Sequence, residues 1–254
     1  MQAPNRTTPV EQRGQYWFKR DDLFEIAGVR GGKARTCWAL SQGATGLITA
    51  SSRQSPQLNI VAQIARQLKI PSRAYVPQGK FTPEMNAARD VGMEIAQVPA
   101  GYNSVLISRA RENAAAYGYR EIPFGMECKE AVSATREQVY NLPRQSKRLV
   151  VPVGSGMSLA GILHGLLDYS FPIQVLGVVC GANPQRRLDR WAPLFWHSLP
   201  VQLVPSGIDY HHPAPATMFE GIGLDPIYEA KCIPFIRPGD CLWIVGIRQT
   251  AVLA

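Results

Sequence analysis

The sequence predicts an α/β fold built on parallel β-sheets, because short apolar runs alternate with segments of helical periodicity along most of the chain. The run 46–50 has the length of a buried strand, and apolar residues then recur at helical spacing from Leu58 to Leu68. Two more strand and helix pairs follow, at 73–76 with 82–91 and at 93–98 with 104–117. Helices that connect parallel strands cover both faces of a sheet, so three layers are expected.

A second set of elements follows a basic, polar stretch in the middle of the chain. Apolar runs and helical periodicity predict strands at 149–153, 173–179 and 241–246 and a helix at 159–167. We therefore expect a small α/β lobe at about 41–148, inserted into a larger lobe made of 1–40 and 149–254.

Composition is that of a globular protein, with 46% hydrophobic and 18% charged residues in a chain of 254. No apolar run approaches the roughly 20 residues of a spanning helix, and residues 1–15 lack the apolar centre of a signal peptide. The expected location is the cytoplasm, or the host cytoplasm if the protein is viral. Five cysteines form no CxxC pair and no His stands at finger spacing, so neither a disulfide framework nor a metal site is predicted.

The formal net charge of +8 leaves two explanations open. A basic surface can attract a polyanion, or it can be basic without any role in nucleic-acid binding. Arginines 186, 187 and 190 stand close to Trp191 and Trp196, a composition that grips phosphates and stacks bases and that also occurs in solvated loops. They lie in a Pro-, Trp- and Arg-rich region, 183–215, for which the sequence predicts no clear elements.

A glycine-rich turn joins the predicted strand 149–153 to the helix that follows. Its residues are Gly154, Ser155, Gly156, Met157 and Ser158. Backbone N–H groups and the positive end of the helix dipole make such a turn a phosphate site, although glycine also serves tight connections that bind nothing.

A lysine stands behind two glycines, Gly31 and Gly32, where a helix at 34–40 begins. The positive helix dipole favours the neutral amine of Lys33, which a Schiff base with a carbonyl cofactor requires. From spacing alone, a solvated surface lysine is the preferred interpretation. A third segment, 224–231, has Asp225 and Pro226 where a turn enters a helix.

The three segments occur in an order that resembles a known family. They read Lys19-Arg20-Asp21-Asp22-Leu23 with Gly31-Gly32-Lys33-Ala34-Arg35, then Gly154-Ser155-Gly156, then Leu224-Asp225-Pro226-Ile227-Tyr228-Glu229-Ala230-Lys231. Together they resemble the family of 1-aminocyclopropane-1-carboxylate (ACC) deaminase and D-cysteine desulfhydrase. That family belongs to the fold type II, tryptophan synthase β-like, enzymes of pyridoxal 5'-phosphate (PLP). The resemblance extends from about Tyr16 to Gly246 and implies two three-layer α/β/α lobes, PLP in the cleft between them, and a homodimer.

The resemblance also implies roles for single residues. Lys33 would carry PLP as a Schiff base and later move the α-proton of the substrate. Residues Gly154, Ser155, Gly156, Met157 and Ser158 would hold the cofactor phosphate. Glu229 would face the pyridine nitrogen and keep it protonated. Tyr228 would act as an acid, a base or a nucleophile.

The segment 51–57 falls where the family has a Ser-Asn-His/Gln loop that receives the substrate carboxylate. The substrate-binding candidates are therefore Ser52, Arg53, Gln54, Ser55 and Gln57. Pro56 replaces the family's Asn, so the contact to the phenolic oxygen of the cofactor is either absent or made by Gln57 or Arg53. The family's Gly-Gly-Asn-Lys also lacks its Asn here, and Val245-Gly246-Ile247-Arg248 replaces a Thr-Gly-Gly.

Three functions remain open at this point. The first is a PLP-dependent lyase that acts on a small amino acid through the Lys33 Schiff base, by α-proton abstraction with elimination or deamination. The second is a PLP-dependent decarboxylase or lyase that acts on an amino-acid group attached to modified thymidine in viral DNA. The third is a protein of this fold that binds a ligand without catalysis.

Overall fold

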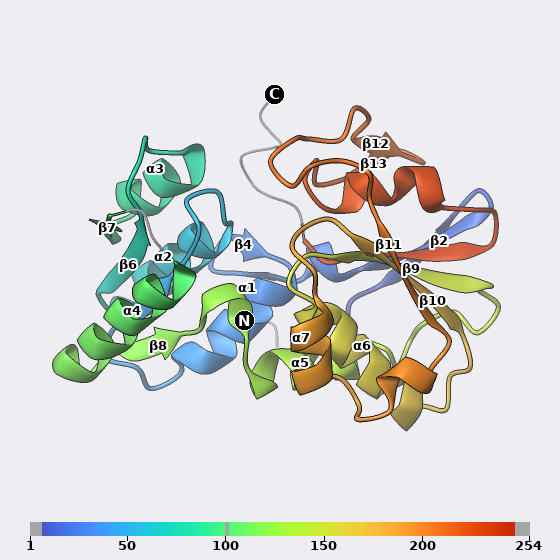
Figure 1. The fold of residues 1–254 in the computed structure, drawn as a ribbon, viewed down its shortest axis with the longest axis horizontal. Helices are drawn as coiled ribbons and strands as arrows, with labels where there is room; N and C mark the ends of the chain where they lie inside the picture. The colour runs from blue at the N-terminus through green and yellow to red at the C-terminus, as the bar shows by residue number, and fades with distance from the viewer. Residues whose placement is uncertain (1–6, 100–101, 247–254) are drawn as a thin grey trace. The chain divides into compact units, whose positions relative to one another are not determined.

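Two parallel β-sheets, each with its own helices, organise the part of the chain that the computed structural model describes, residues 7–99 and 102–246 (Figure 1). By their contacts, these residues divide into a smaller unit, Glu25–Glu130, and a larger unit, 7–24 with 131–246. The predicted α/β fold with parallel sheets is therefore confirmed.

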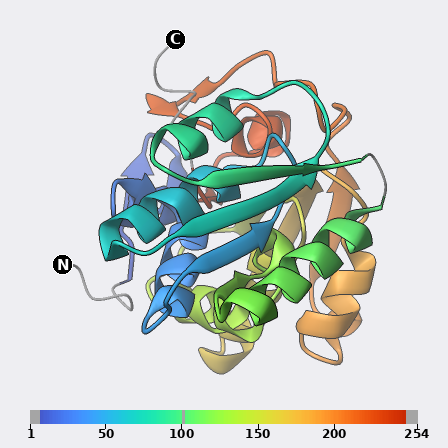
Figure 2. The same ribbon diagram turned by 90° about the vertical axis from the view of Figure 1, so that its left-hand side faces the viewer.

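The smaller unit contains a sheet in the order β7-β6-β5-β8, with all neighbouring strands parallel. Figure 2 shows arrows of neighbouring strands in this sheet running the same way. The strands are β5 (Leu47–Ala50), β6 (Ser72–Pro77), β7 (Glu94–Val98) and β8 (Arg120–Ile122). These bounds agree with the predicted strands to within a few residues.

Alternation along β5 explains why helices cover both faces of this sheet. Ile48 and Ala50 pack against helix α4 (Asn103–Tyr117). Thr49 points the other way, and its Oγ1 accepts a hydrogen bond of 2.8 Å from Nε2 of Gln57, the first residue of α2 (Gln57–Leu68). The order of apolar and polar residues in the strand thus fixes which helix lies on which face.

Helix α1 (Gly32–Ser41) belongs to the smaller unit, because it contacts α2 and β8. The division of the chain accordingly falls at 24/25 and 130/131, whereas the sequence analysis placed the lobe at about 41–148. The unit also contains β3 (Glu25–Ile26), β4 (Val29–Arg30), α3 (Pro83–Asp90) and the 3-10 turn η2 (Phe124–Met126).

The larger unit is built on a sheet in the order β1-β2-β14-β9-β10-β11. Only the edge pair β1–β2 is antiparallel, and the other neighbours are parallel. The strands are β1 (Val10–Arg13), β2 (Tyr16–Arg20), β9 (Arg148–Val153), β10 (Gln174–Val179), β11 (Val201–Pro205) and β14 (Asp240–Ile244). The remaining elements are η1 (Asp21–Leu23), α6 (Met157–Asp168), α7 (Gln185–Trp191), η3 (Trp196–Ser198), β12 (Met218–Phe219), β13 (Ile222–Gly223) and η4 (Glu229–Phe235). Helix α5 (Lys129–Glu137) begins in the smaller unit and continues into the larger one.

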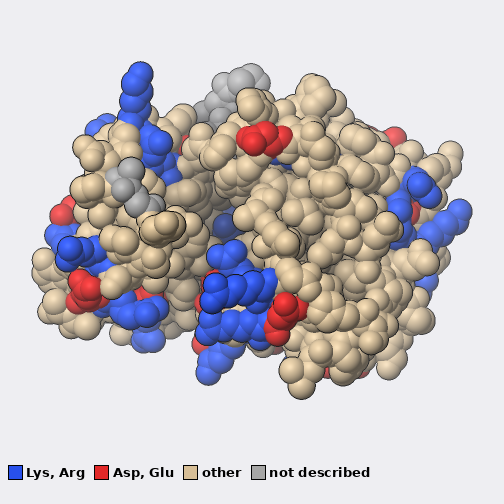
Figure 3. Space-filling view, in the orientation of Figure 1, with Lys and Arg blue, Asp and Glu red and all other residues tan. Residues whose placement is uncertain are grey.

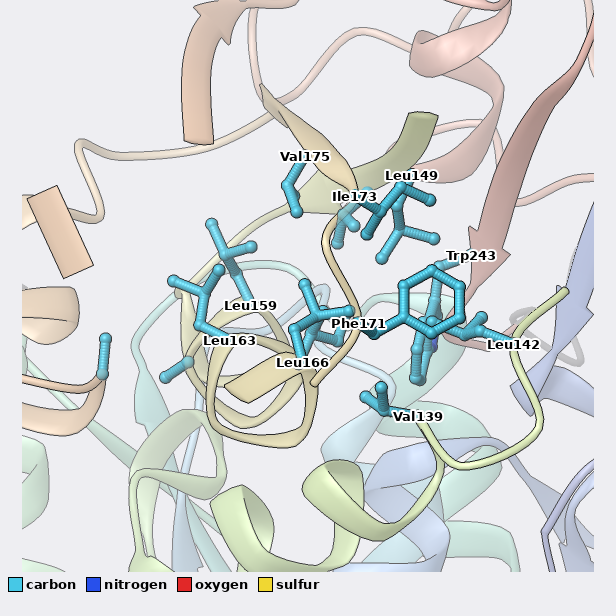
Figure 4. Packing of buried hydrophobic residues seen from close by; sticks show 14 of the residues in the cluster. Val139, Leu142, Leu149, Leu159, Leu163, Leu166, Phe171, Ile173, Val175 and Trp243 are labelled. Atoms are coloured by element: carbon cyan, nitrogen blue, oxygen red, sulfur yellow. The ribbon is translucent and has the colours of Figure 1, made fainter. Parts of the chain in front are cut away.

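Strand β9 is buried on both faces, so successive residues enter different cores. Leu149, Val151 and Val153 pack with α6 on one face, in the cluster that Figure 4 shows around Leu159, Leu163 and Leu166. On the other face, Val150 packs with Leu176 of β10, Leu242 of β14 and residues of η4. A continuous apolar run at this point of the sequence is the expected signature of such a strand.

The charged residues of the first sequence motif, Lys19 to Asp22, are buried and form a polar network at the end of β2. The Lys19 Nζ donates hydrogen bonds of 2.7 Å to the Thr8 carbonyl and to Asn141 Oδ1. Arg20 forms ion pairs with Glu11 at 2.9 Å and with Asp22 at 2.8 Å. Burial raises the pKa of Asp22 despite this pairing. These contacts give the motif a structural role within the larger unit.

No helix among the described residues is long and apolar enough to cross a membrane. Within the same residues, no group of three or more His, Cys, Asp or Glu side chains is arranged to hold a metal ion.

Gly161 and Gly165 let α6 approach α5 closely. A Cβ on Gly165 would lie 2.5 Å from the Arg136 carbonyl oxygen and from Val139 Cγ2.

We expect Gly165→Ala to lower the free energy of unfolding by about 1–3 kcal/mol, because overpacking outweighs the gain of about 1 kcal/mol in helix propensity. Urea denaturation measures this effect. The control Leu167→Ala changes a residue of α6 that is 37% exposed and should cost less; equal stability of Gly165→Ala and wild type would contradict the close packing.

Candidate functional site

The glycine-rich turn lies at the carboxyl end of β9, where ligands bind in open parallel sheets. Gly156 precedes α6 with φ +89°, a conformation that residues with a side chain rarely adopt. Its carbonyl accepts the first helical hydrogen bond, from Ala160 N at 2.9 Å. The N–H groups of the first turn of α6 have no acceptor within the helix and point out of its amino end. They can therefore bind an anion at this end.

A tyrosine ring covers this turn. A Cβ on Gly154 would lie 2.7 Å from Tyr228 Cε1, so only glycine leaves room for the ring. The Tyr228 hydroxyl is 2.9 Å from the hydroxyl of Tyr210, and the two form a hydrogen bond. Gly181, which follows β10, lies against Gly154 and Tyr210: its Cβ would be 3.6 Å from the Gly154 carbonyl and from Tyr210 Cδ2. Gly154 and Gly181 follow the adjacent strands β9 and β10. They therefore lie against Tyr228 and Tyr210, whose hydroxyl groups are hydrogen-bonded to each other.

Glu229 is the next residue, and its carboxyl group is almost completely buried. Oε1 accepts hydrogen bonds from the backbone N–H groups of Val245 at 3.0 Å and Gly246 at 3.2 Å. Oε2 is also buried, and it has no hydrogen-bond partner in the described part of the chain. Burial raises the pKa of Glu229 well above its usual value, and the nearby Asp225 carboxylate adds to the effect. Residues 247 and 248 of the replaced Thr-Gly-Gly lie outside the described residues.

Asp225 and Lys231 hold the segment around Tyr228 in place. Asp225 Oδ1 accepts hydrogen bonds from the N–H groups of Ile227 at 2.8 Å and Tyr228 at 3.1 Å. The fully buried Lys231 donates a hydrogen bond of 2.7 Å to the Asp209 carbonyl. Instead of the helix predicted from Asp225 and Pro226, the chain forms a 3-10 segment that contains Pro234. A proline at that position removes a backbone donor, and the segment stays irregular.

Two cysteines lie beside this segment. A hydrogen bond from the Cys232 thiol lowers the pKa of Cys180, while burial raises the pKa of Cys232. Cys180 Sγ also lies 3.5 Å from the Tyr228 carbonyl. Sequence analysis assigned neither cysteine to the site, and it missed Tyr210, which stands in the unassigned region 183–215. No local pattern marks these residues, since their neighbours come from distant parts of the chain.

Lys33 lies in the smaller unit, as the second residue of α1. Gly31 precedes the helix with φ +91°, and its carbonyl accepts hydrogen bonds from Ala34 N at 3.0 Å and Arg35 N at 3.2 Å. The predicted helix start behind two glycines is therefore confirmed. The half-buried Lys33 side chain stands in the first turn, as the sequence predicts.

The loop 51–57 precedes α2 in the same unit. Both N–H groups of the Gln57 amide are used, in hydrogen bonds of 2.8 Å to Thr49 Oγ1 and to the Pro123 carbonyl. Its buried Oε1 has no partner among the described residues. Arg53 donates a hydrogen bond of 3.1 Å to the Lys80 carbonyl. The side chain of Gln57 can therefore accept a further hydrogen bond, through Oε1, but cannot donate one. It could replace the family's Asn, whose position Pro56 occupies, only as an acceptor.

The remaining candidates of this loop are Ser52, Gln54 and Ser55. Ser55 Oγ accepts a hydrogen bond of 3.3 Å from Gln57 N, and the Ser52 carbonyl accepts one of 3.1 Å from Ser55 N. Gln54 is exposed. The structure brings Gly154, Tyr228 and Glu229 together in the larger unit, and it places Lys33 and this loop in the smaller one.

Comparison with known proteins gives a curated relative and many structures. No family model matches the sequence. The O-seryl-dTMP PLP-dependent decarboxylase of Salmonella phage ViI is 27% identical over 208 residues, which make up 69% of this chain and 49% of that protein. The match thus spans about half the length of the relative.

Solved structures agree over almost the whole chain. An ACC deaminase homologue has a TM-score of 0.79 at 21% identity, and the match covers 95% of this chain and 89% of that one. An O-ureido-L-serine synthase has a TM-score of 0.69 at 14% identity, with 97% and 90% covered. The processed form of threonine deaminase isoform 2 from Solanum lycopersicum has a TM-score of 0.64 at 15% identity, with 95% and 79% covered.

The raised pKa of Glu229 predicts a pH dependence of stability without any ligand. A group whose folded-state pKa is raised stabilises the fold below its unfolded pKa of about 4.3, and this contribution is lost as pH rises towards the folded pKa, by at most about 1.4 kcal/mol per pH unit. Glu229→Gln keeps the shape and removes the titration, so we expect a smaller fall in the free energy of unfolding above pH 5 than in wild type.

Urea denaturation between pH 5 and pH 8 measures the difference. Asp22 contributes equally to both proteins, and the exposed Glu220→Gln is the matched control. Parallel pH profiles for wild type and Glu229→Gln would contradict the raised pKa of this buried carboxyl group.

Proposed function

Because the chain has the fold of fold type II PLP enzymes, we propose that it is a PLP-dependent lyase that acts on an amino acid and carries its cofactor on Lys33. The observation that carries the proposal is the buried Oε2 of Glu229, which has no partner among the described residues and lies one residue from the tyrosine that covers the glycine-rich turn. A phosphate-binding turn and an unsatisfied carboxyl oxygen together fit a molecule with a phosphate at one end and a ring nitrogen at the other.

The chemical groups of the residues present match those that PLP requires. Gly154–Ser158 would hold the phosphate through the N–H groups that begin α6. Glu229 Oε2 would take the pyridine nitrogen as its missing hydrogen-bond partner, and the Lys33 amine would carry the cofactor. When bound, PLP withdraws electrons from the α-carbon of an attached amino acid.

Proton transfer falls to the chain's own side chains. Burial and the nearby Asp225 carboxylate raise the pKa of Glu229 well above its usual value, so its carboxyl group binds a proton more tightly than an exposed one and can share that proton with a basic nitrogen. Lys33 Nζ, in the neutral form favoured at a helix start, accepts the α-proton. Tyr228 can give or take a proton at its hydroxyl oxygen, and the hydroxyl of Tyr210 at 2.9 Å supplies or receives the next one.

The loop 51–57 would bind the substrate carboxylate. Hydrogen bonds within the loop, from Ser55 N to the Ser52 carbonyl and from Gln57 N to Ser55 Oγ, fix its backbone before any ligand arrives. Such preorganisation lowers the entropic cost of binding. Ser52, Arg53 and Gln54 would supply the remaining polar contacts.

A second candidate function is decarboxylation of an amino-acid group attached to a thymidine nucleotide. The relative from phage ViI, an O-seryl-dTMP PLP-dependent decarboxylase, supports it. In this reaction the bond between the α-carbon and the carboxylate breaks, carbon dioxide leaves, and a proton is added to the α-carbon. Both candidates use the same cofactor site, and they differ in which bond to the α-carbon is broken.

Substitution of Lys33 tests the cofactor assignment. We expect purified wild type to show the visible absorption band of lysine-bound PLP and to lose it on borohydride reduction, which leaves PLP covalently attached. Lys33→Ala should lack the band, because no other amine replaces the lost one. The control Lys80→Ala removes an exposed lysine of the same unit and should retain it. Absence of the band from wild type would overturn the enzyme proposal in favour of a ligand-binding protein of this fold.

Substrate choice separates the two candidates. We expect mass spectrometry to detect loss of carbon dioxide from O-seryl-dTMP if the second candidate is correct, and release of ammonia from free amino acids if the first is correct. Glu229→Gln should lower either rate by about 10-fold or more, because an amide supplies no proton to the ring nitrogen. Turnover of neither substrate class by PLP-loaded wild type would contradict both.

A further inference from the structure

Two loops of the smaller unit, 51–57 and 78–82, follow neighbouring parallel strands. Strand β5 ends at Ala50 and β6 ends at Pro77, and the two strands are paired in parallel. Both loops therefore leave the sheet at its carboxyl edge, where open parallel sheets bind ligands.

Arg53 connects these two loops through its backbone and through its side chain. The Arg53 carbonyl accepts a hydrogen bond from Thr82 Oγ1, and Nη1 donates one of 3.1 Å to the Lys80 carbonyl. Thr82 also caps α3, since its Oγ1 accepts a hydrogen bond of 3.3 Å from Met85 N. The guanidinium group of Arg53 is thus directed towards the loop 78–82.

Gly79 leaves room for this guanidinium group. A Cβ on Gly79 would lie 2.2 Å from Nη1 and 2.6 Å from Cζ of Arg53. The Gly79 carbonyl accepts a hydrogen bond of 2.9 Å from Gln97 Nε2, which ties the glycine to β7. Any side chain at position 79 would therefore displace the guanidinium group.

One edge of the guanidinium group remains for a ligand. Among the described residues, no hydrogen bond or ion pair engages Nε or Nη2 of Arg53, whose side chain is half-buried. These two nitrogens form the fork that binds both oxygens of a carboxylate or phosphate. The same edge does so elsewhere in this chain: Nε and Nη2 of Arg20 lie 2.9 Å and 2.8 Å from the two carboxylate oxygens of Asp22.

We infer that Arg53 binds the phosphate of a thymidine nucleotide that carries the amino-acid group of the substrate. The inference deepens the second candidate function and rests on it. The backbone of the loop 51–57 would take the carboxylate of the amino-acid group, and the Arg53 fork, directed towards the loop 78–82, would take the second anion.

Charge favours a phosphate over a second carboxylate. Lys80 is exposed and adds a positive charge on the residue whose carbonyl orients Arg53. A phosphate monoester carries about −1.5 to −2 charges at pH 7 and has three acceptor oxygens, so a fork and an ammonium group can share it. Figure 3 shows Lys and Arg side chains on the surface where Figure 1 draws α3, the helix that follows this loop.

The test is isothermal titration calorimetry of the PLP-loaded protein with dTMP and with thymidine, which lacks the phosphate. Wild type should bind dTMP at least about 10-fold more tightly than thymidine, because hydrogen bonds between charged groups are the strong ones. Arg53→Gln should lose this preference and bind thymidine like wild type. Arg66→Gln removes the same charge from an exposed position of the same unit and should bind dTMP like wild type.

Two further variants separate geometry from charge. Arg53→Lys keeps the charge without the fork and should recover only part of the affinity for dTMP. Gly79→Ala keeps Arg53 and displaces its guanidinium group, so it should weaken binding of dTMP and leave binding of thymidine unchanged. Urea denaturation shows whether each variant is folded.

A single-stranded thymidine oligonucleotide distinguishes the source of the phosphate. Binding of dTMP that depends on Arg53 supports a free nucleotide as substrate. Binding of the oligonucleotide alone that depends on Arg53 supports a nucleotide within DNA. If neither ligand binds more tightly than thymidine, the inference is wrong.

Two other results would overturn the inference. The first is equal weakening of dTMP binding by Arg53→Gln and Arg66→Gln, which would leave only net charge as the cause. The second concerns L-serine, whose binding is followed by the change in the PLP absorption band. If Arg53→Gln weakens binding of L-serine as much as binding of dTMP, Arg53 binds the carboxylate.

The inference and the proposed function fail in different ways. Lys33→Ala should lose the PLP band and still bind dTMP through Arg53. Absence of any preference for dTMP or the oligonucleotide, with an intact PLP band, would remove the role of Arg53 and leave the lyase proposal standing.

Discussion

The need to cover both faces of strand β9 shapes the larger unit. Leu149, Val151 and Val153 require one apolar layer and Val150 another, and each buried side chain of this size contributes about 1.5–3 kcal/mol. Helix α6 supplies the first layer and the segment around η4 supplies part of the second. Both layers reach the carboxyl end of β9, so the glycine-rich turn from one and Tyr228 from the other come into contact there. The candidate site is a consequence of how the sheet is covered.

Hydrogen bonding inside this region distinguishes polar groups that are satisfied from one that is not. Asp225 and Lys231 are satisfied by backbone atoms, which fix the path of the chain around Tyr228. Glu229 Oε2 is left without a partner among the described residues, and an unsatisfied buried polar atom costs about 1–3 kcal/mol. Trp243 Nε1 is likewise unsatisfied there, but it lies in the hydrophobic core. Glu229 instead lies one residue from the tyrosine that covers the glycine-rich turn, and burial raises the pKa of its carboxyl group.

Helix α7 closely approaches the same glycine-rich turn. Glycine at position 156 allows Pro184 and Leu188 to contact the backbone that would hold the cofactor phosphate. The smaller unit contains Lys33 and the loop 51–57, whose conformation is fixed by hydrogen bonds within the loop and by the hydrogen bonds of the Gln57 amide.

The sequence by itself determined the alternation of strands and helices, the helix start at Lys33 and the glycine-rich turn at 154–158, because these depend on local periodicity and on the backbone freedom of glycine. Its motifs also pointed to Tyr228 and Glu229. Only the tertiary structure decided that η4 is a 3-10 segment, that Tyr210 pairs with Tyr228, that Gln57 has no donor left, and that α7 lies on Gly156. Each of these depends on contacts between residues far apart in the chain, which no local pattern encodes.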